Sequence, residues 1–305
     1  MKLSKDRRVP CDDGIAEMLI DRLPLHPSQH PIVFRMKPAE MAITRCSYSP
    51  ERVAVQNILG VNIAVSSYGD VVNACTAWAD AGESHSVFFA NVHMLMEAHD
   101  RPAFRAKLNT ADMINPDGMP LVWALHALRQ HDARRVYGPD ATEALLRAAQ
   151  NSQIAIGFYG GTVTTLDQLL SNVKSRYPGI RIVFAMSPPF RLVSKTEDES
   201  IVKQIADSGA RFLFVGLGCP KQEGWIIDHT GRIPAVMLGV GAAFDFLAGS
   251  KPQAPRWMMR NGLEWVFRFV SEPRRLAGRY LKHNPRFVFL FLLQWLRRDM
   301  PHSCI

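Results

Sequence analysis

The chain has 305 residues, 47% of them hydrophobic and 21% charged, with a formal net charge of +8. This is the composition of an ordinary globular protein, and the length allows one large α/β domain with an appendage or two modest domains. The five cysteines are scattered with no C-x-x-C pair, which argues against a disulfide framework or a zinc site and fits a reducing cytoplasm. No apolar run reaches the length of a transmembrane helix.

The basic excess lies wholly in the C-terminal tail. Residues 251–305 carry 11 Lys and Arg against 3 Asp and Glu, whereas residues 1–250 carry 25 charges of each sign. A basic tail on a neutral body indicates an anionic partner, which would be a phosphate group, nucleic acid or a membrane surface.

Residues 1–55 mix prolines, charges and short apolar pieces without sustained periodicity. We expect a loosely structured, variable N-terminal extension with no identifiable chemistry. Its charged start has no apolar run behind it, so a signal peptide is not predicted.

Residues 56–250 alternate short β-rich runs with helical patterns. This alternation predicts an α/β core, a Rossmann-like and mostly parallel sheet with helices on both faces, in which ligands bind beyond the carboxyl ends of the strands. The predicted strands are residues 61–66, 86–90, 153–159, 181–186, 211–218 and 235–241. The predicted helices cover residues 71–81, 93–108, 164–177 and 199–208, and three more follow the turns PDG (116–118), GPD (138–140) and CPKQ (219–222).

Residues 251–305 are rich in Arg, Trp and Phe and are predicted to form short helices, a basic helical C-terminal appendage. Residues 287–296 form an apolar run of ten residues flanked by Arg286 and Arg297. Ten helical residues reach about 15 Å, half of a hydrocarbon core of about 30 Å, so this run cannot span a bilayer. It could lie in the membrane interface with its arginines at anionic head groups, or dock on the protein core, and we favour the interface.

Three glycine turns follow predicted strands: GFYGGT (157–162), VGLGCPKQE (215–223) and GVGAAFDF (239–246). Such turns let a phosphate or sugar approach the backbone, where free N–H groups can bind it. Gly160, Gly161 and Gln222 are the candidates for this role. The third turn comes close to a dinucleotide fingerprint, but Phe244 replaces its last glycine. Each turn serves equally well as a plain strand-to-helix connection.

Motifs for nucleophilic or metal-dependent catalysis do not occur in the sequence. It has no G-x-S-x-G, no H-E-x-x-H, no Walker lysine motif and no D-x-D. His93 lies within the apolar run of Met94, Leu95 and Met96, which favours a satisfied, partly buried histidine over a ligand. We therefore expect no metal and no cofactor.

Two aspartates lie in the stretch NTADMINPDGMPLVW (109–123). Asp112 precedes apolar residues, which favours a loop or strand-start role. Asp117 is held between Pro116 and Gly118 at a strand end in front of a helix. As an N-cap it would contribute about 1 kcal/mol, and as a general base it would lie at the ligand edge of the sheet. The residues alone leave these two interpretations close to balanced.

Six ordered blocks resemble one protein family. They are ADMINPDGMPLVWA, RVYGPD, IGFYGGT, FVGLGCPKQEGWI, LGVGAAFDFLAG and GLEWVFRFVSEPRRLAGRYL, within residues 57–281. Together they are similar to the bacterial WecG/TagA/CpsF glycosyltransferases. The resemblance implies an inverting, metal-independent transfer from a UDP-sugar to a lipid-linked sugar at the cytoplasmic membrane face, in teichoic acid linkage-unit, enterobacterial common antigen or exopolysaccharide synthesis. It also implies that the basic appendage serves both membrane contact and the active site.

The resemblance assigns roles to individual residues. Asp117 matches the proposed general base, and Asn91 and Gln222 match residues of the pocket. The tail arginines Arg268, Arg275 and Arg279 match residues that contact the UDP diphosphate. Arginine suits that task without a metal, because its planar fork pairs with phosphate oxygens bidentately.

Four departures from the family pattern bear on the pocket. Phe89 replaces a small polar residue, which removes any hydroxyl role there. Asn115 and Pro120 differ from the residues that usually flank PDG, and Gln253 stands where a basic residue is common. Gln253 puts one contact of the tail in question, and the departures around PDG and at Phe89 favour an exopolysaccharide enzyme over the amino-sugar members; the donor sugar stays open.

The leading hypothesis is thus a UDP-sugar transferase that acts on a polyprenyl-diphosphate-linked sugar while associated with the inner face of the cell membrane. It predicts no nucleic-acid partner, and the sequence leaves open whether the chain forms a homo-oligomer. The alternative is a nucleotide-binding α/β protein whose basic, aromatic tail binds nucleic acid by stacking and phosphate contact. Against it, the apolar run at residues 287–296 suits lipid better.

Overall fold

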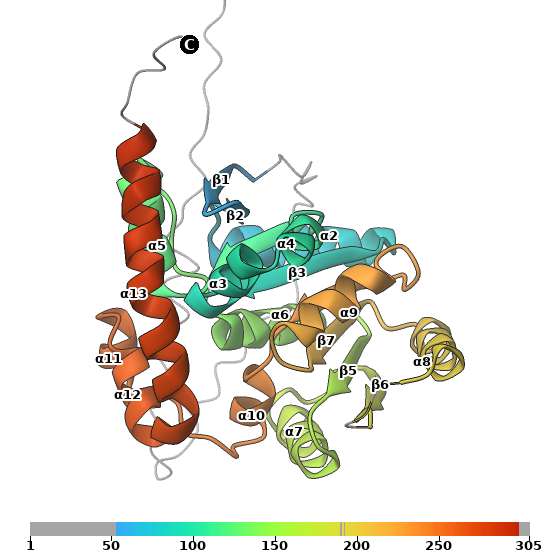
Figure 1. The fold of residues 1–305 in the computed structure, drawn as a ribbon. Helices are drawn as coiled ribbons and strands as arrows, with labels where there is room; N and C mark the ends of the chain where they lie inside the picture. The colour runs from blue at the N-terminus through green and yellow to red at the C-terminus, as the bar shows by residue number, and fades with distance from the viewer. Residues whose placement is uncertain (1–52, 190, 192, 299–305) are drawn as a thin grey trace, which may run out of the picture. The chain divides into compact units, whose positions relative to one another are not determined.

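The computed structural model describes residues 53–298 except 190 and 192, without the side chains of Arg260, Arg275 and Arg298. The predicted extension lies outside the described residues except for its last three. A six-stranded parallel sheet has the order β4-β3-β8-β7-β5-β6 (Figure 1), which confirms the predicted α/β class. The strands are β3 (His85–Ala90), β4 (Met113–Pro116), β5 (Ile156–Gly160), β6 (Ile182–Met186), β7 (Phe212–Gly216) and β8 (Val236–Gly239).

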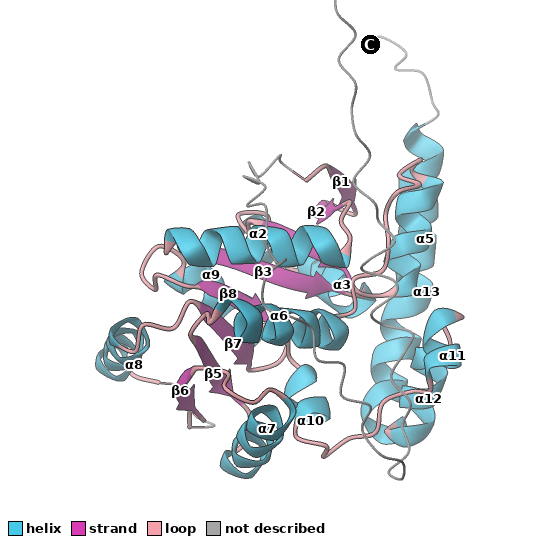
Figure 2. Cartoon of the chain, turned by 180° about the vertical axis from the view of Figure 1, so that it is seen from behind, coloured by secondary structure: helices cyan, strands magenta, loops and turns pink. Residues whose placement is uncertain are grey.

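Helices cover both faces of the sheet (Figures 1 and 2), because alternate residues of a strand point to opposite sides. In β7, Phe212 and Phe214 enter one apolar core, and Leu213 and Val215 enter the other. The first core includes residues of α2 (Tyr68–Ala81), α6 (Gly138–Ser152), α7 (Val163–Arg176) and α10 (Ala243–Leu247). The second includes residues of α3 (Val92–Asp100), α4 (Pro102–Leu108), α5 (Met119–Ala127), α8 (Lys195–Asp207) and α9 (Lys221–His229).

Two of these helices begin at capping boxes. Ser67 and Asp70 cap α2, and Ser194 and Glu197 cap α8, each pair exchanging side-chain and backbone hydrogen bonds. Each box supplies hydrogen-bond acceptors to two backbone N–H groups that would otherwise lack partners at the helix start. Glu197, at the acidic start of α8, therefore has a structural role.

The predicted strand at residues 61–66 does not join the parallel sheet, which corrects the sequence interpretation. β1 (Val55–Ile58) and β2 (Val61–Ala64) form a separate antiparallel hairpin. The two turn residues, Leu59 and Gly60, have φ values of 50° and 88°. Positive φ at both positions is typical of a two-residue hairpin turn. An antiparallel pair joined by such a turn needs no crossover connection of the kind that joins parallel strands.

The tail contains one long helix rather than only short ones. α11 (Arg256–Arg260) and α12 (Glu264–Ser271) are short, but α13 (Pro273–Arg298) runs for 26 residues with Pro285 inside it. At 1.5 Å per residue α13 is about 39 Å long. Pro285 has no backbone N–H to donate within the helix. The helix nevertheless continues, because residues before and after Pro285 pack against the rest of the protein. The domain boundaries near residues 55 and 250 stay predictions.

α13 docks on the core with one face and exposes the other. Phe287 is buried in the second core, and Leu290 and Phe291 pack against it. Val288 and Phe289 on the other face are 62% and 61% exposed. Core docking and an exposed apolar surface therefore coexist on this helix. Within the described range, no helix is both long and apolar enough to cross a bilayer.

Candidate active site

A cavity lies at the carboxyl ends of β3 and β4, walled by the first turns of α3 and α5 and by α12 and α13. Its lining includes Asn91, Asp117, Arg268 and Arg279, four of the residues singled out from the sequence. Both strands are parallel, so the residues that follow them meet at one edge of the sheet. The appendage closes the cavity over that edge.

The two aspartates of the PDG region lie at opposite ends of β4. Asp112 precedes the strand and accepts hydrogen bonds from the backbone N–H of Ser86 at 2.8 Å and its Oγ at 3.0 Å, the strand-start role expected of it. Asp117 follows the strand and lines the cavity. The N-cap of α5 is Gly118, which has no side-chain cap bond, so the capping interpretation of Asp117 is wrong.

Asp117 is a carboxylate with a near-neutral pKa. Its side chain is 17% exposed and lies 3.5 Å from the guanidinium of Arg135 (Nη2 to Oδ1). Burial raises the pKa of Asp117 to about 7, an effect that Arg135 opposes and the Glu264 carboxylate reinforces. A group with this pKa is ionised in part at neutral pH and can both take up and release a proton.

Arg135 links Asp117 to the tail. Its Nε donates to the backbone carbonyl of Asp117 at 2.5 Å, and its Nη2 forms an ion pair with Glu264. Glu264 in turn lies 3.3 Å from Nε of Arg268, an i,i+4 partner on α12. The guanidinium of Arg135 also stacks 4.4 Å from the ring centre of Tyr137. This network fixes α12 beside the end of β4.

The cavity favours an anionic ligand. Among its charged lining residues, three arginines (Arg135, Arg268 and Arg279) face two carboxylates, Asp117 and Glu264. The positive excess persists when Asp117 is ionised. Arg279 reaches the cavity from α13, while the side chain of Arg275 on the same helix lies outside the described part of the structure.

Asn91 has a structural role beside its place in the cavity. It is the N-cap of α3, and its Oδ1 accepts a hydrogen bond from the backbone N–H of Met94 at 3.2 Å. Cβ of Asn91 also lies 3.5 Å from where a side chain on Gly118 would begin. This is ordinary van der Waals distance, so position 118 lies directly against Asn91 at the cavity wall.

Gly160, Gly161 and Gln222 lie at the same edge of the sheet but do not line this cavity. Gly160 has φ of +131°, and a Cβ there would lie 2.5 Å from the carbonyl oxygen of Gly216. The N–H of Gly161 donates to that carbonyl at 3.1 Å. The amide of Gln222 bonds to Gly218 N–H and to Glu223. Their assignment to substrate binding stays a prediction.

The four departures from the family pattern occupy different environments. Pro120 lines the cavity. Asn115 is fully buried, where it accepts from Ser66 Oγ at 2.7 Å and donates to the carbonyl of Phe88, so it acts on the fold rather than on the cavity wall. Phe89 is buried in the first core, and Gln253 is exposed.

Sequence reasoning missed Arg135 and Glu264, the two residues that connect Asp117 to the tail. Both stood in quoted motifs, Arg135 opening RVYGPD and Glu264 within GLEWVF. An arginine and a glutamate buried against each other carry no local signal, because they lie 129 residues apart. Their motif positions were the available clue.

The expectation of a satisfied His93 is wrong for one ring nitrogen. Its Nδ1 is buried without a hydrogen-bond partner among the described residues. The ring lies 5.2 Å from the ring of His283, centre to centre, and both residues line the cavity. Burial and the nearby Arg279 lower the pKa of His93 to about 4.

Comparison with known proteins identifies the family. A family model described as the glycosyl transferase WecG/TagA/CpsF family matches residues 56–301. A relative from Bacillus spizizenii is 28% identical over 228 residues, 74% of this chain and 86% of its own. One from Staphylococcus aureus is 30% identical over 236 residues, 76% and 90% of the two chains. Both are named N-acetylglucosaminyldiphosphoundecaprenol N-acetyl-beta-D-mannosaminyltransferase. The chain therefore belongs to the WecG/TagA/CpsF family and is a glycosyltransferase.

Proposed function

We propose that this glycosyltransferase moves a sugar from a UDP-sugar to a sugar carried on a polyprenyl diphosphate, with Asp117 as the general base. The observation that carries the proposal is that Asp117, with its near-neutral pKa, shares one cavity with Arg268 and Arg279. The two relatives are named for an acceptor of this chemical class and for a beta-linked product. These names support the proposed acceptor and an inverting reaction.

The proton and the sugar move in one displacement. The Asp117 carboxylate takes the proton from the acceptor hydroxyl while that oxygen attacks the anomeric carbon. The bond from that carbon to the UDP oxygen breaks on the opposite side. A UDP-α-sugar therefore yields a β-linked product.

The leaving UDP gains negative charge as its bond to the sugar breaks. Arg268 and Arg279 lie where they can stabilise that charge bidentately. Arg268 is paired with Glu264, which holds its guanidinium against α12 before the donor binds. We propose that these arginines replace the metal ion that holds the diphosphate in other glycosyltransferases.

The exposed side of the tail suits a membrane surface. Val288, Phe289, Leu292 and Leu296 of α13 and Trp265 of α12 are exposed apolar residues, within the segment that carries the basic excess. An apolar surface with neighbouring cations fits peripheral binding to anionic lipid. Because Trp265 and Val288 also line the cavity, such binding would bring the cavity to a lipid-held acceptor at the inner face of the cell membrane.

A donor screen tests the proposal. UDP release is measured with a short-chain lipid-diphosphate sugar as acceptor and UDP-linked glucose, glucuronic acid, N-acetylmannosamine and its uronic acid as donors. The relatives' names make UDP-N-acetylmannosamine the first donor to try, whereas Pro120, the departure from the family pattern that lines the cavity, favours an exopolysaccharide sugar. Acceptor-dependent release, a β-linked product and no stimulation by Mg²⁺ or Mn²⁺ are expected. An α-linked product from a UDP-α-sugar would refute the single displacement.

A further inference from the structure

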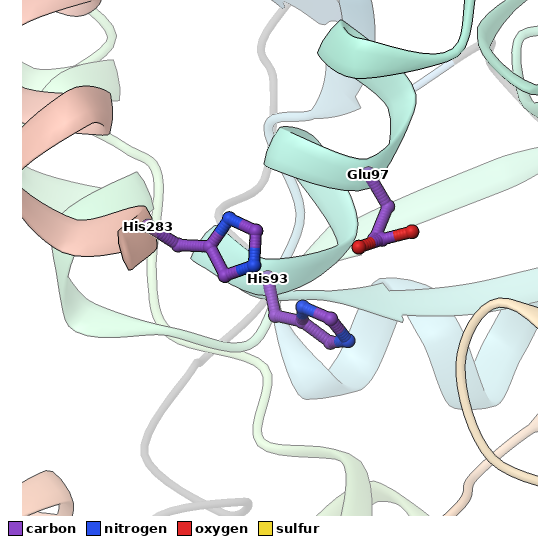
Figure 3. A group of neighbouring side chains, drawn as sticks. All are labelled: His93, Glu97 and His283. Carbon is purple, nitrogen blue, oxygen red and sulfur yellow. The ribbon is translucent and has the colours of Figure 1, made fainter. Parts of the chain in front are cut away.

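Three side chains that can ligate a metal meet where α13 crosses α3 (Figure 3). His93 and Glu97 project from α3, and His283 projects from α13. One ligand atom from each residue lies within 4.8 Å of the other two. His93 and Glu97 are four residues apart, so a helix places them on one face.

The two histidines lack the hydrogen bonds that buried imidazoles usually make. Nδ1 of His93 and Nδ1 of His283 are both buried, and neither has a partner in the described part of the chain. A buried polar atom left without a partner is destabilising, so it calls for an explanation. A ligand bound by both rings would supply one.

The nature of the ligands selects the class of ion. Two imidazole nitrogens and one carboxylate suit Zn²⁺ and neighbouring transition ions, whereas Mg²⁺ and Ca²⁺ prefer oxygen ligands throughout. Zn–N bonds of about 2.0–2.1 Å place tetrahedral ligand atoms about 3.3 Å apart. The largest separation here, up to 4.8 Å, therefore has to shorten by about 1.5 Å. Side-chain rotation across the helix contact can provide this change.

Some charges around the three side chains favour binding of a dication, and others oppose it. Glu97 supplies one negative charge, and Arg101 occupies only one of its two oxygens, with Nη2 3.3 Å from Oε2. Arg279 and Lys282 of α13 add positive potential at His93, which opposes binding of a dication. A fourth ligand that supplies an anionic oxygen would offset that charge.

We propose that His93, Glu97 and His283 bind one divalent transition-metal ion, best matched by Zn²⁺, which fastens α13 to α3. The same contact already carries a bidentate ion pair, Arg286 with Asp100, at 2.6 and 3.0 Å. The ion would thus hold the turn of α13 that carries Arg279 into the cavity. His93 and His283 also line the proposed active-site cavity, so the ion would act on the transfer reaction through the position of Arg279, while arginines rather than the metal stabilise the diphosphate.

Metal binding is measured on the whole chain, freed of any histidine tag, stripped with a chelator and dialysed. Co²⁺ titration followed by visible absorption, and Zn²⁺ competition against a chromophoric chelator, should each give one ion per chain. Replacing any of the three ligands, by His93→Ala, Glu97→Gln or His283→Ala, should lower the affinity at least about tenfold, since even outer-shell changes at metal sites cost 10–100-fold. His99→Ala, a histidine of α3 outside the cluster, should bind as the parent does.

Thermal unfolding gives a second readout. Zn²⁺ should raise the Tm of the parent and of His99→Ala, because a ligand that binds only the folded state stabilises it. At the same Zn²⁺ concentration it should raise the Tm of the ligand variants less. A parent that binds neither ion at one per chain overturns the proposal whatever the variants do. Equal binding by parent and all three ligand variants overturns it as well. No sugar substrate is present in either assay, so the outcome is separate from that of the donor screen.

Discussion

Replacing Asp117 with asparagine tests the general base directly. The change keeps the size of the side chain and removes its ability to accept a proton. Arg135 loses a carboxylate 3.5 Å away but keeps its ion pair with Glu264, so its charge stays compensated and UDP binding should change little. A general base contributes roughly 10²–10⁴ in rate, which corresponds to about 2.7–5.4 kcal/mol of activation free energy. We expect kcat to fall by at least about 10².

The assay separates turnover from binding. UDP release at saturating donor and acceptor gives kcat, and calorimetry gives the affinity for UDP. Asp112→Asn is the matched control, because it makes the same chemical change at the opposite end of β4, where Asp112 bonds to Ser86 outside the cavity. Its turnover should equal that of the parent.

The pH profile supplies an independent check. The active form is the carboxylate, and burial raises the pKa of Asp117 to about 7, so kcat/KM should rise with pH through about 7 and be lost below it. Asp117→Asn should lack this limb. Near-normal turnover in Asp117→Asn, or a loss of UDP affinity as large as the loss of turnover, would refute the assignment.

Three further predictions concern the tail. Glu264→Gln removes a carboxylate that raises the pKa of Asp117, so the acidic limb of kcat/KM should move to lower pH, and an unmoved midpoint contradicts the network. Arg268→Lys keeps the charge but loses the bidentate fork, so kcat/KM for the UDP-sugar should fall at least about tenfold, while Arg256→Lys on the exposed side of α11 should match the parent. Phe289→Glu should weaken binding to acidic liposomes several-fold and leave turnover of a short-chain acceptor unchanged. When binding is measured across a series of salt concentrations, the parent should bind acidic liposomes and not single-stranded DNA, and the reverse result would favour the nucleic-acid alternative.

Much of the sheet could be predicted because its signals are local. In β7, each of Phe212, Leu213, Phe214 and Val215 is apolar, as a strand buried on both faces requires. The hairpin of β1 and β2 was missed since the strand pattern at residues 61–66 looks the same in either pairing. The antiparallel pairing requires a turn in which Leu59 has a positive φ. Leu59 is not a glycine, so the sequence gives no turn signature at that position.

The candidate site was predictable to the extent that it follows from chain topology. Asp117 follows a strand, so the carboxyl-end rule placed it at the ligand edge of the sheet, whereas Asn91 was assigned from the family resemblance. Arg268 and Arg279 came from the family resemblance, since no periodicity indicates which arginines of a basic tail turn inward. The ion pair of Arg135 with Glu264 depends on how the tail docks, which local sequence does not encode.

α13 carries residues of the cavity and residues that we expect to contact the membrane. A deletion of the whole tail could not separate these two roles. Removing residues 251–305 would take away Arg268 and Arg279, but also Glu264, Leu276 and Phe287, which are buried against the rest of the protein. Loss of activity in such a truncation would therefore follow from misfolding as readily as from lost chemistry. Single substitutions at separate positions of the helix avoid this ambiguity. Arg279 faces the cavity and Phe289 is largely exposed, so a change at the first should act on the donor and a change at the second on the membrane. If Phe289→Glu lowered turnover of a soluble acceptor as much as an arginine change does, Phe289 would contribute to the active site itself and not only to membrane contact.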